Sequence, residues 1–239
     1  MAFLAAHPAA AGPPYRTDDP EPVEPHHWEI YDFSTATHLK GDTAGVLSGI
    51  DANYGAASGL QLHAAFPIAF DNPSGGGMKL GAGDTEFGFK YRLVKSDAGG
   101  WLPEFAIYPV VDFPTGNAAR SLGTGHTHAF LPTWLQKSFG DWTTFAGAGY
   151  WINPGAGNRN YWYFGWAVQR QVSDNVAIGG EIFHQTANTV GGNDQTGFDL
   201  GVTYDLNEHY HLLFSAGQGS QNRTTTNEFT YYAALQFTF

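Results

Sequence analysis

The C-terminal segment alternates strictly between two kinds of side chain, and this pattern constrains the fold more than any other feature. One face is apolar and carries Phe229, Tyr231, Ala233, Leu235, Phe237 and Phe239; the other is mostly polar and carries Glu228, Thr230, Tyr232, Ala234, Gln236 and Thr238. Successive side chains of a strand point to opposite sides of the sheet. This strand therefore needs an apolar and a polar surrounding, which lipid and a lumen supply in a transmembrane β-barrel.

The same alternation recurs from Trp28 onward. Phe87 and Phe89 alternate with Glu86 and Lys90, for example. The faces stay ambiguous in the first, sixth and seventh expected strands, because Trp and Tyr occur on both. We expect an all-β, antiparallel transmembrane barrel of about twelve strands, each of roughly 10–14 residues, which is enough to cross a bilayer at a tilt. The strands are expected to start near Trp28, Thr43, Ser58, Gly81, Trp101, His126, Trp142, Asn160, Asn175, Gln195, Glu208 and Thr226.

Connections between these strands alternate in length, as in bacterial outer-membrane barrels. Short turns are expected around 56–57, 140–141, 173–174 and 207, with a longer turn at 96–100. Longer loops rich in glycine and asparagine are expected at 71–80, 114–125, 153–159, 188–194 and 218–225. The pattern predicts short periplasmic turns, longer extracellular loops and a location in the outer membrane of a Gram-negative cell.

Composition excludes several other classes. Charged residues make up only 14% of the chain, against roughly 25% in a typical soluble domain. A soluble β-sandwich or barrel is therefore disfavoured, since its exterior would need more charge. The net charge of −11 argues against a nucleic-acid partner, which calls for a basic surface. Without cysteine, the chain has no disulfide and no thiolate metal site.

The N-terminal part divides into two segments ahead of the barrel. Residues 1–11 resemble the end of a signal peptide, since an apolar stretch is followed by small residues. Residues 12–26 are rich in proline and acid, and proline lacks the donor that a strand ladder needs. We expect this segment to be an arm, either periplasmic or folded into the barrel as a plug. The barrel itself is expected over residues 27–239.

Several segments resemble a family of outer-membrane barrels labelled "putative transporter of the meta-pathway of phenol degradation". The similar segments are 12–23 (GPPYRTDDPEPV), 83–92 (GDTEFGFKYR), 108–116 (YPVVDFPTG), 134–142 (WLQKSFGDW), 150–155 (YWINPG) and 168–171 (VQRQ). The resemblance implies an outer-membrane location and passage of small molecules, aromatic or hydrophobic ones among them. It implies no catalytic residue.

A charged cluster on two neighbouring strands is the main candidate site. With both faces assigned by parity, the cluster comprises Asp84, Glu86, Lys90, Arg92, Glu104, Tyr108 and Asp112. Charges in a narrow lumen set selectivity, whereas ion pairs across strands would instead close the interior. The arm residues Tyr15, Arg16, Asp18 and Asp19 are expected to join this network.

Histidines are a second set of candidates, and each has a plainer interpretation. His126 and His128 share a strand face near the outer mouth, but no further metal ligand is evident. His26 and His27 are adjacent and would point to opposite faces. His184, expected to face outward near Thr186, Asn188 and Thr189, suggests a lipid hydrolase, but no serine has matching spacing. We expect no catalytic centre, metal or cofactor.

Aromatic residues are the last candidates. Trp101, Trp142 and Trp162 fit a girdle at the membrane interface, while Tyr161 and Tyr163 are expected to face the lumen. The sequence thus predicts an outer-membrane channel or transporter for small molecules, in contact with lipid and solute. The alternatives are a closed structural or partner-binding barrel, with partner proteins unknown, and a lipid-modifying hydrolase.

Overall fold

The computed structural model describes residues 14–96 and 100–239. The expected signal segment, 1–11, lies outside the described residues. The strands are β1 (Trp28–Leu39), β2 (Asp42–Ala57), β3 (Leu60–Pro73), β4 (Lys79–Ala82), β5 (Thr85–Val94), β6 (Glu104–Ile107), β7 (Val110–Phe113), β8 (His128–Phe139), β9 (Trp142–Ile152), β10 (Tyr161–Ser173), β11 (Val176–Gln185), β12 (Gln195–Asp205), β13 (Tyr210–Gln221) and β14 (Phe229–Thr238). Two short helices lie in loops, η1 (Ala118–Arg120) and α1 (Arg223–Thr226).

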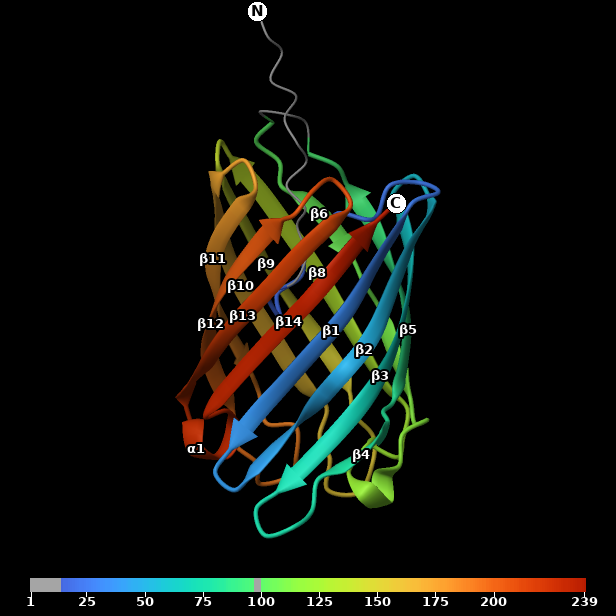
Figure 1. The fold of residues 1–239 in the computed structure, drawn as a ribbon, viewed down its shortest axis with the longest axis vertical. Helices are drawn as coiled ribbons and strands as arrows, with labels where there is room; N and C mark the ends of the chain where they lie inside the picture. The colour runs from blue at the N-terminus through green and yellow to red at the C-terminus, as the bar shows by residue number, and fades with distance from the viewer. Residues whose placement is uncertain (1–13, 97–99) are drawn as a thin grey trace, which may run out of the picture.

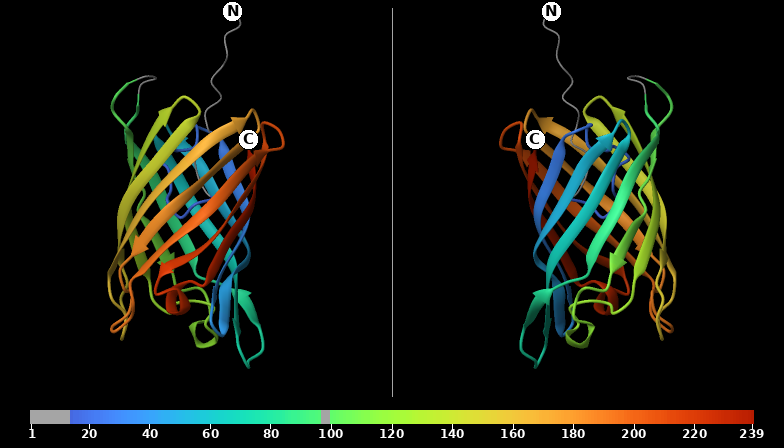
Figure 2. Two further views of the ribbon diagram at one scale, coloured as in Figure 1. Left: turned by 90° about the vertical axis from the view of Figure 1, so that its left-hand side faces the viewer. Right: turned by 90° about the vertical axis from the view of Figure 1, so that its right-hand side faces the viewer.

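These segments close into one antiparallel barrel. β1 pairs with both β2 and β14, which seals the sheet. β4 and β5 both pair with β3, and β6 and β7 both pair with β8, so each pair is one interrupted span. Fourteen segments minus these two interruptions give the twelve expected strands. Figure 2 shows their common tilt around the barrel.

The two interruptions have local causes. Between β6 and β7, Pro109 has no amide hydrogen to donate, and the neighbouring Tyr108 amide donates to Pro132 O at 3.2 Å. Between β4 and β5, the Gly83 amide donates to Pro67 O at 2.9 Å, while Asp84 turns toward a loop. The sequence pattern predicted single continuous strands here, which was wrong in this detail.

The two rims differ as expected for an outer-membrane barrel. At the upper rim of Figure 1, β2–β3, β8–β9 and β10–β11 are joined by turns of two residues. The lower rim carries the longer connections 74–78, 114–127, 153–160, 186–194 and 222–228. Two turns differ from their predicted positions: the β2–β3 turn lies at 58–59 rather than 56–57, and the β10–β11 turn at 174–175 rather than 173–174. The β1–β2 connection, for which no length was predicted, is a tight turn at 40–41.

Large apolar side chains cover the outside of the barrel. Ile182 is 51% exposed and Leu200 66% exposed, and such residues occur on nearly every strand. Exposed apolar area on this scale is stable against lipid and not in water, which excludes the soluble alternative. Among the described residues, no helix is long and apolar enough to cross a membrane. The closed fold and this exterior make the chain an outer-membrane β-barrel protein.

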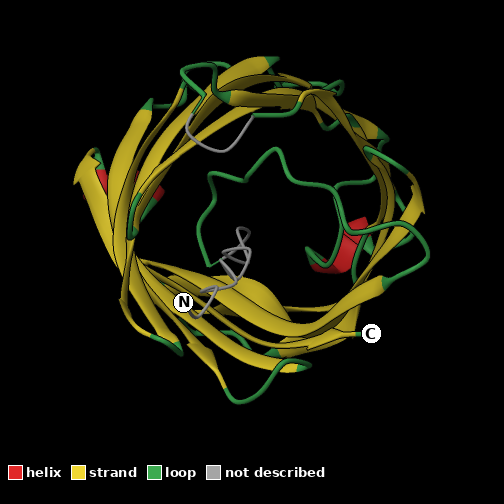
Figure 3. Cartoon of the chain, turned by 90° about the horizontal axis from the view of Figure 1, so that it is seen from above, coloured by secondary structure: helices red, strands yellow, loops and turns green. Residues whose placement is uncertain are grey.

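Polar and small side chains fill the inside. The buried polar residues include Gln61, His63, Lys90, Glu181 and Asp199, all on strands. The described part of the arm, 14–26, runs inside the ring of strands, where Figure 3 shows it as a loop crossing the interior. It then joins β1 at the upper rim, where Trp28 exchanges backbone hydrogen bonds with Phe239. The arm and the inner faces of the strands therefore form the candidate site.

Candidate functional site in the lumen

Lys90 on β5 is the cation that holds the acidic part of the arm. Its Nζ lies 3.2 Å from Asp18 Oδ1 and 3.6 Å from Asp19 Oδ1, and 5.0 Å from the centre of the Tyr108 ring. Lys90 and Asp19 are both almost completely buried. A buried charge needs a partner to offset its lost hydration, so lysine and arm stabilise each other.

Glu181 on β11 holds the arm from another wall. Its carboxylate accepts hydrogen bonds from the Arg16 amide (2.7 Å), the Thr17 amide (2.9 Å) and Thr17 Oγ1 (2.7 Å). Around the barrel, β5 and β11 are separated by the interrupted span β6/β7 and by β8, β9 and β10 on one side, and by more strands on the other. The arm is thus bonded to walls that lie across the lumen from each other.

Arg16 extends from the arm toward the extracellular side. Its Nε lies 3.7 Å from Asp199 Oδ2, its Nη2 donates to Thr230 Oγ1 at 3.3 Å, and its guanidinium lies 4.4 Å from the centre of the Phe183 ring. Charge pairing and a cation–π contact together fix this side chain. Arg16 therefore borders the part of the lumen that lies on the extracellular side of the arm.

Two glycines of the wall make room for the arm. A Cβ atom on Gly165 would lie 2.0 Å from Thr17 Oγ1, and one on Gly179 would lie 2.6 Å from the Tyr15 hydroxyl. No side chain fits at those distances, so the wall is shaped around the arm. Tyr15 is buried and packs against Phe145 and Ala167.

The arm is also held where it returns toward the rim. The Val23 amide donates to Gln61 Oε1 at 3.0 Å, and Gln136 Nε2 donates to Glu21. Burial, helped by the nearby charge of Glu104, raises the pKa of Glu21 above the ordinary value of a glutamate. Tyr15 is affected in the same direction, since burial raises the pKa of its hydroxyl.

The other members of the predicted cluster are brought together, with one exception. Arg92 Nη1 lies 3.3 Å from Glu104 Oε2, and Glu86 is the register partner of Asp112. Asp84 lies apart, in the break between β4 and β5. Its carboxylate accepts hydrogen bonds from the Gly116 amide at 2.9 Å and the Thr124 amide at 2.7 Å, so it anchors an extracellular loop.

The structure also places the predicted aromatics. Tyr161 and Tyr163 lie on the inward face of β10, where Tyr163 is buried and its hydroxyl lies 3.4 Å from Thr17 Oγ1. The intervening Trp162 is 46% exposed on the outer face. Trp142 and Trp166 are exposed on the outside as well, and Trp101 lies exposed in the loop 95–103.

The histidines are spread over separate positions. His126 and His128 pack with ring centres 5.5 Å apart near the outer mouth. His26 and His27 are exposed at the opposite rim. Within residues 14–96 and 100–239, no three His, Cys, Asp or Glu side chains are grouped to hold a metal ion. His184 Nδ1 pairs with Thr196 Oγ1 at 2.8 Å, and that hydroxyl donates to Gln221, so the side chain that the histidine contacts is a threonine and not a serine.

Several residues of the site were not singled out from the sequence. The most important are Glu181, Asp199, Gln136, His63 and Thr17. Strand parity places Glu181 and Asp199 inward, so their orientation was available. Their partners were not, because parity gives the face of a strand and not the depth that the arm reaches. His63, which contacts Asp51 (3.1 Å) and Glu86 (2.7 Å), carries the same inward signal.

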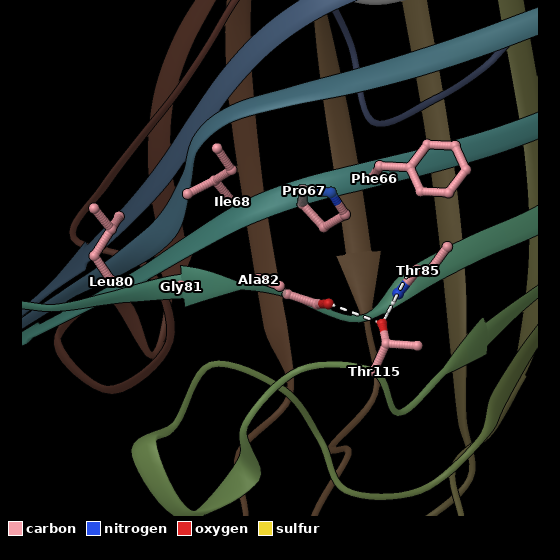
Figure 4. Close-up of a pocket in the computed structure, with 9 residues that line it drawn as sticks. Phe66, Pro67, Ile68, Leu80, Gly81, Ala82, Thr85 and Thr115 are labelled. Carbon is pink, nitrogen blue, oxygen red and sulfur yellow. Dashed lines mark hydrogen bonds between the residues drawn. The ribbon is translucent and has the colours of Figure 1, made fainter.

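A second hollow lies on the barrel wall, away from the lumen network. It borders the break between β4 and β5 and is lined by Phe66, Pro67, Ile68, Leu80, Gly81, Ala82, Gly83, Thr85 and Thr115 (Figure 4). Thr115 Oγ1 accepts a hydrogen bond from the Thr85 amide and donates one to Gly83 O, each at 3.0 Å. A loop side chain thus replaces ladder bonds that the broken strand lacks.

Comparison with known proteins gives one family and several similar structures. The model of the family described as "Putative MetA-pathway of phenol degradation" matches residues 24–237. An outer membrane channel from Pseudomonas putida F1 is similar over 92% of this chain and 98% of its own, with a TM-score of 0.75 and 14% identity. The KdgM porin (TM-score 0.58, 8% identity, 87% of this chain and 99% of its own) was solved with disordered oligogalacturonate. The NanC porin has a TM-score of 0.59 at 8% identity, over 87% of this chain and 98% of its own.

These likenesses concern the fold, since all three identities are low. A comparison with curated protein sequences gives no significant match. The chain accordingly has the architecture of a porin-like outer-membrane channel, and the chemistry of its lumen is its own.

Proposed function

This chain belongs to the family described as "Putative MetA-pathway of phenol degradation", and from that premise we propose that it is a passive channel for small solutes whose lumen the N-terminal arm narrows. The solutes are small and include aromatic or hydrophobic molecules. The similar structures are channels and porins, which favours a channel over a hydrolase or a closed partner-binding barrel.

One observation carries the proposal: the arm is bonded to opposite walls of the lumen through charges. Lys90 binds Asp18 and Asp19 on one side, and Glu181 binds the arm backbone on the other. A filling built from apolar side chains would often be as stable as buried charge pairs or more stable. Charged contacts can instead exchange with water, so an arm held in this way can be displaced without unfolding the barrel.

The experiment is solute uptake by proteoliposomes, with the arm loosened by two substitutions. Asp18→Asn with Asp19→Asn removes both anions from Lys90. Each lost charge-assisted bond is worth about 1.5–3 kcal/mol, so the equilibrium constant for docking of the arm falls by roughly tenfold or more. Uptake of a small sugar is expected to rise accordingly. Glu208→Gln is the matched control, because its carboxyl is exposed in the turn between β12 and β13.

Equal uptake by both variants and the unmodified barrel would contradict the proposal that the arm limits passage. No uptake by any of the three would contradict the channel itself and favour a closed barrel that acts through a partner.

A further inference from the structure

An arginine and a tryptophan lie side by side on the outside of the barrel, at its periplasmic rim. Arg170 on β10 and Trp142 on β9 are register partners, and the Arg170 guanidinium lies 5.3 Å from the centre of the Trp142 ring. Both residues belong to the outward faces of their strands, and both are exposed. The turns next to them, 140–141 and 174–175, lie at the upper rim of Figure 1. Tryptophan at this height marks the membrane interface, so Arg170 lies at the level of the lipid headgroups.

The Arg170 guanidinium is left without an anion from the protein. It makes no ion pair and no side-chain hydrogen bond with residues 14–96 or 100–239. Lys137 on β8 is the other cation on an outward strand face, and its Nζ instead donates to the carbonyl oxygens of Gly100 and Leu102. A guanidinium is weakly hydrated and presents a planar fork of donors that fits a phosphate group. A phosphate at the headgroup level would therefore satisfy the donors of Arg170.

Two acidic residues lie on the aqueous side of Arg170. Asp141 precedes Trp142, and its carbonyl oxygen accepts a hydrogen bond from the Gln171 amide at 2.8 Å, next to Arg170 along the chain. Asp174 lies in the turn that follows β10, and both aspartates are exposed. From the membrane outward, the protein thus presents a cation first and anions second. A zwitterionic phospholipid has the complementary order, because its phosphate lies nearer to the acyl chains than its ammonium group does.

The outer surface on the membrane side of Arg170 offers apolar contacts to an acyl chain. Ala146 on the outward face of β9 has Leu135 and Trp166 as its register partners on the neighbouring strands. Ala148, two residues farther along that face, has Phe164 as its partner on β10. These three larger side chains are exposed on the outside of the barrel. A chain that lies along the two alanines would therefore contact larger apolar side chains on both sides, and such contacts favour association.

We propose that Arg170 and Trp142 form a binding site for a zwitterionic phospholipid of the periplasmic leaflet, with a primary ammonium headgroup as in phosphatidylethanolamine. Arg170 binds the phosphate, the aspartates of the adjoining turns attract the ammonium group, and an acyl chain follows the alanines of β9. Phospholipid is the most abundant source of phosphate at this level of a bilayer, which favours lipid over a free anion. The site lies outside the lumen, so it is independent of the proposed channel function.

The test is native mass spectrometry of the whole barrel, released from detergent micelles that contain one added phospholipid at a time. Phosphatidylethanolamine, phosphatidylglycerol and phosphatidylcholine with identical acyl chains separate the headgroups, because the second has no ammonium group and the third has no ammonium hydrogens. Phosphatidylethanolamine is expected to be retained best. Arg170→Gln should lower its affinity by roughly tenfold or more, the effect of losing one charge-assisted hydrogen bond. Trp142→Leu should weaken retention in the same direction, since the guanidinium loses the ring beside it.

Matched control variants lie at the extracellular side of the barrel. Arg159→Gln removes an exposed arginine from the loop 153–160, away from the outward strand faces. Trp162→Leu removes an outward ring that is exposed like that of Trp142 but has no arginine as its register partner on β9. Both controls should retain phosphatidylethanolamine as the unmodified barrel does.

Retention that falls in Arg170→Gln and stays in Arg159→Gln supports the site, whether or not the barrel conducts. Equal retention in both variants would overturn it, as would equal or stronger retention of phosphatidylglycerol by the unmodified barrel. Displacement of the lipid by an equal concentration of inorganic phosphate would also overturn it, because the site would then bind a free anion.

Discussion

At the residue scale, one lysine of the barrel wall, Lys90, holds two acidic residues of the arm, Asp18 and Asp19. Lys90 was identified from its inward parity, and the arm acids from their composition, but their pairing required the fold. Asp18 and Asp19 reach Lys90 because the arm bends inside the barrel, and alternation on a strand says nothing of such a bend. Strand parity therefore predicted which strand residues face the lumen, and the arm was expected to join them, but the sequence did not indicate which arm residue meets which strand residue.

Glu21 gives this arm a dependence on pH. Its pKa is raised in the docked arm by burial and by Glu104, and takes an ordinary value when the arm is free. A group with a raised pKa in the docked state binds its proton more tightly there, so docking strengthens as pH falls through that range. Uptake should therefore decrease from about pH 8 to about pH 5. Glu21→Gln should take up less solute at the higher pH and show a smaller decrease; an identical pH profile would contradict this role.

At the element scale, the regular strands were predicted and the interruptions were not. Alternation in β3, β5, β12 and β14 predicted the inner and outer faces correctly, because lipid and lumen impose opposite requirements on each strand. The break at Asp84 depends on contacts with a distant loop, which a pattern along one strand does not contain. The break at Pro109 could have been predicted from the proline itself, which lacks the amide hydrogen that a strand ladder needs.

Thr115 should stabilise the wall at the break between β4 and β5. Thr115→Val keeps the shape and removes the bonds to the Thr85 amide and to Gly83 O. Leaving such groups unpaired costs about 1–3 kcal/mol, so exchange of the Thr85 amide hydrogen should accelerate by roughly tenfold or more. Thr133→Val is the control, since its hydroxyl makes one long bond of 3.4 Å. Unchanged exchange at Thr85 would show that the wall does not depend on Thr115.

A substitution of Gly165 on the barrel wall should displace the arm without any change in the arm itself. A leucine there would occupy the position of Thr17 Oγ1 and leave the arm sequence intact. Gly165→Leu is expected to raise solute uptake to the level of the Asp18→Asn, Asp19→Asn variant. Gly77→Ala, where a Cβ meets open space, should behave like the unmodified barrel. If the Gly165→Leu barrel folds with unchanged uptake, the contact between Gly165 and Thr17 does not position the arm.

At the scale of the whole molecule, the apolar exterior of the barrel requires a lipid bilayer around it. Leu200 lies in the middle of β12 and is 66% exposed. Arginine at such a midplane position costs about 2–4 kcal/mol. Leu200→Arg should lower the free energy of unfolding from bilayers by that amount, as measured in guanidinium. Leu206→Arg, in the turn at the rim, should cost far less, and equal costs would contradict the assigned lipid band.

The central claim is that the arm narrows an otherwise passable lumen. Its most direct test is the single-channel conductance, in planar bilayers, of the full-length barrel and of a barrel without residues 12–25. We predict a small conductance for the full chain and a clearly larger, steady conductance after the deletion. The same conductance in both would show that the arm does not limit passage. No conductance in either barrel would contradict the proposed channel function.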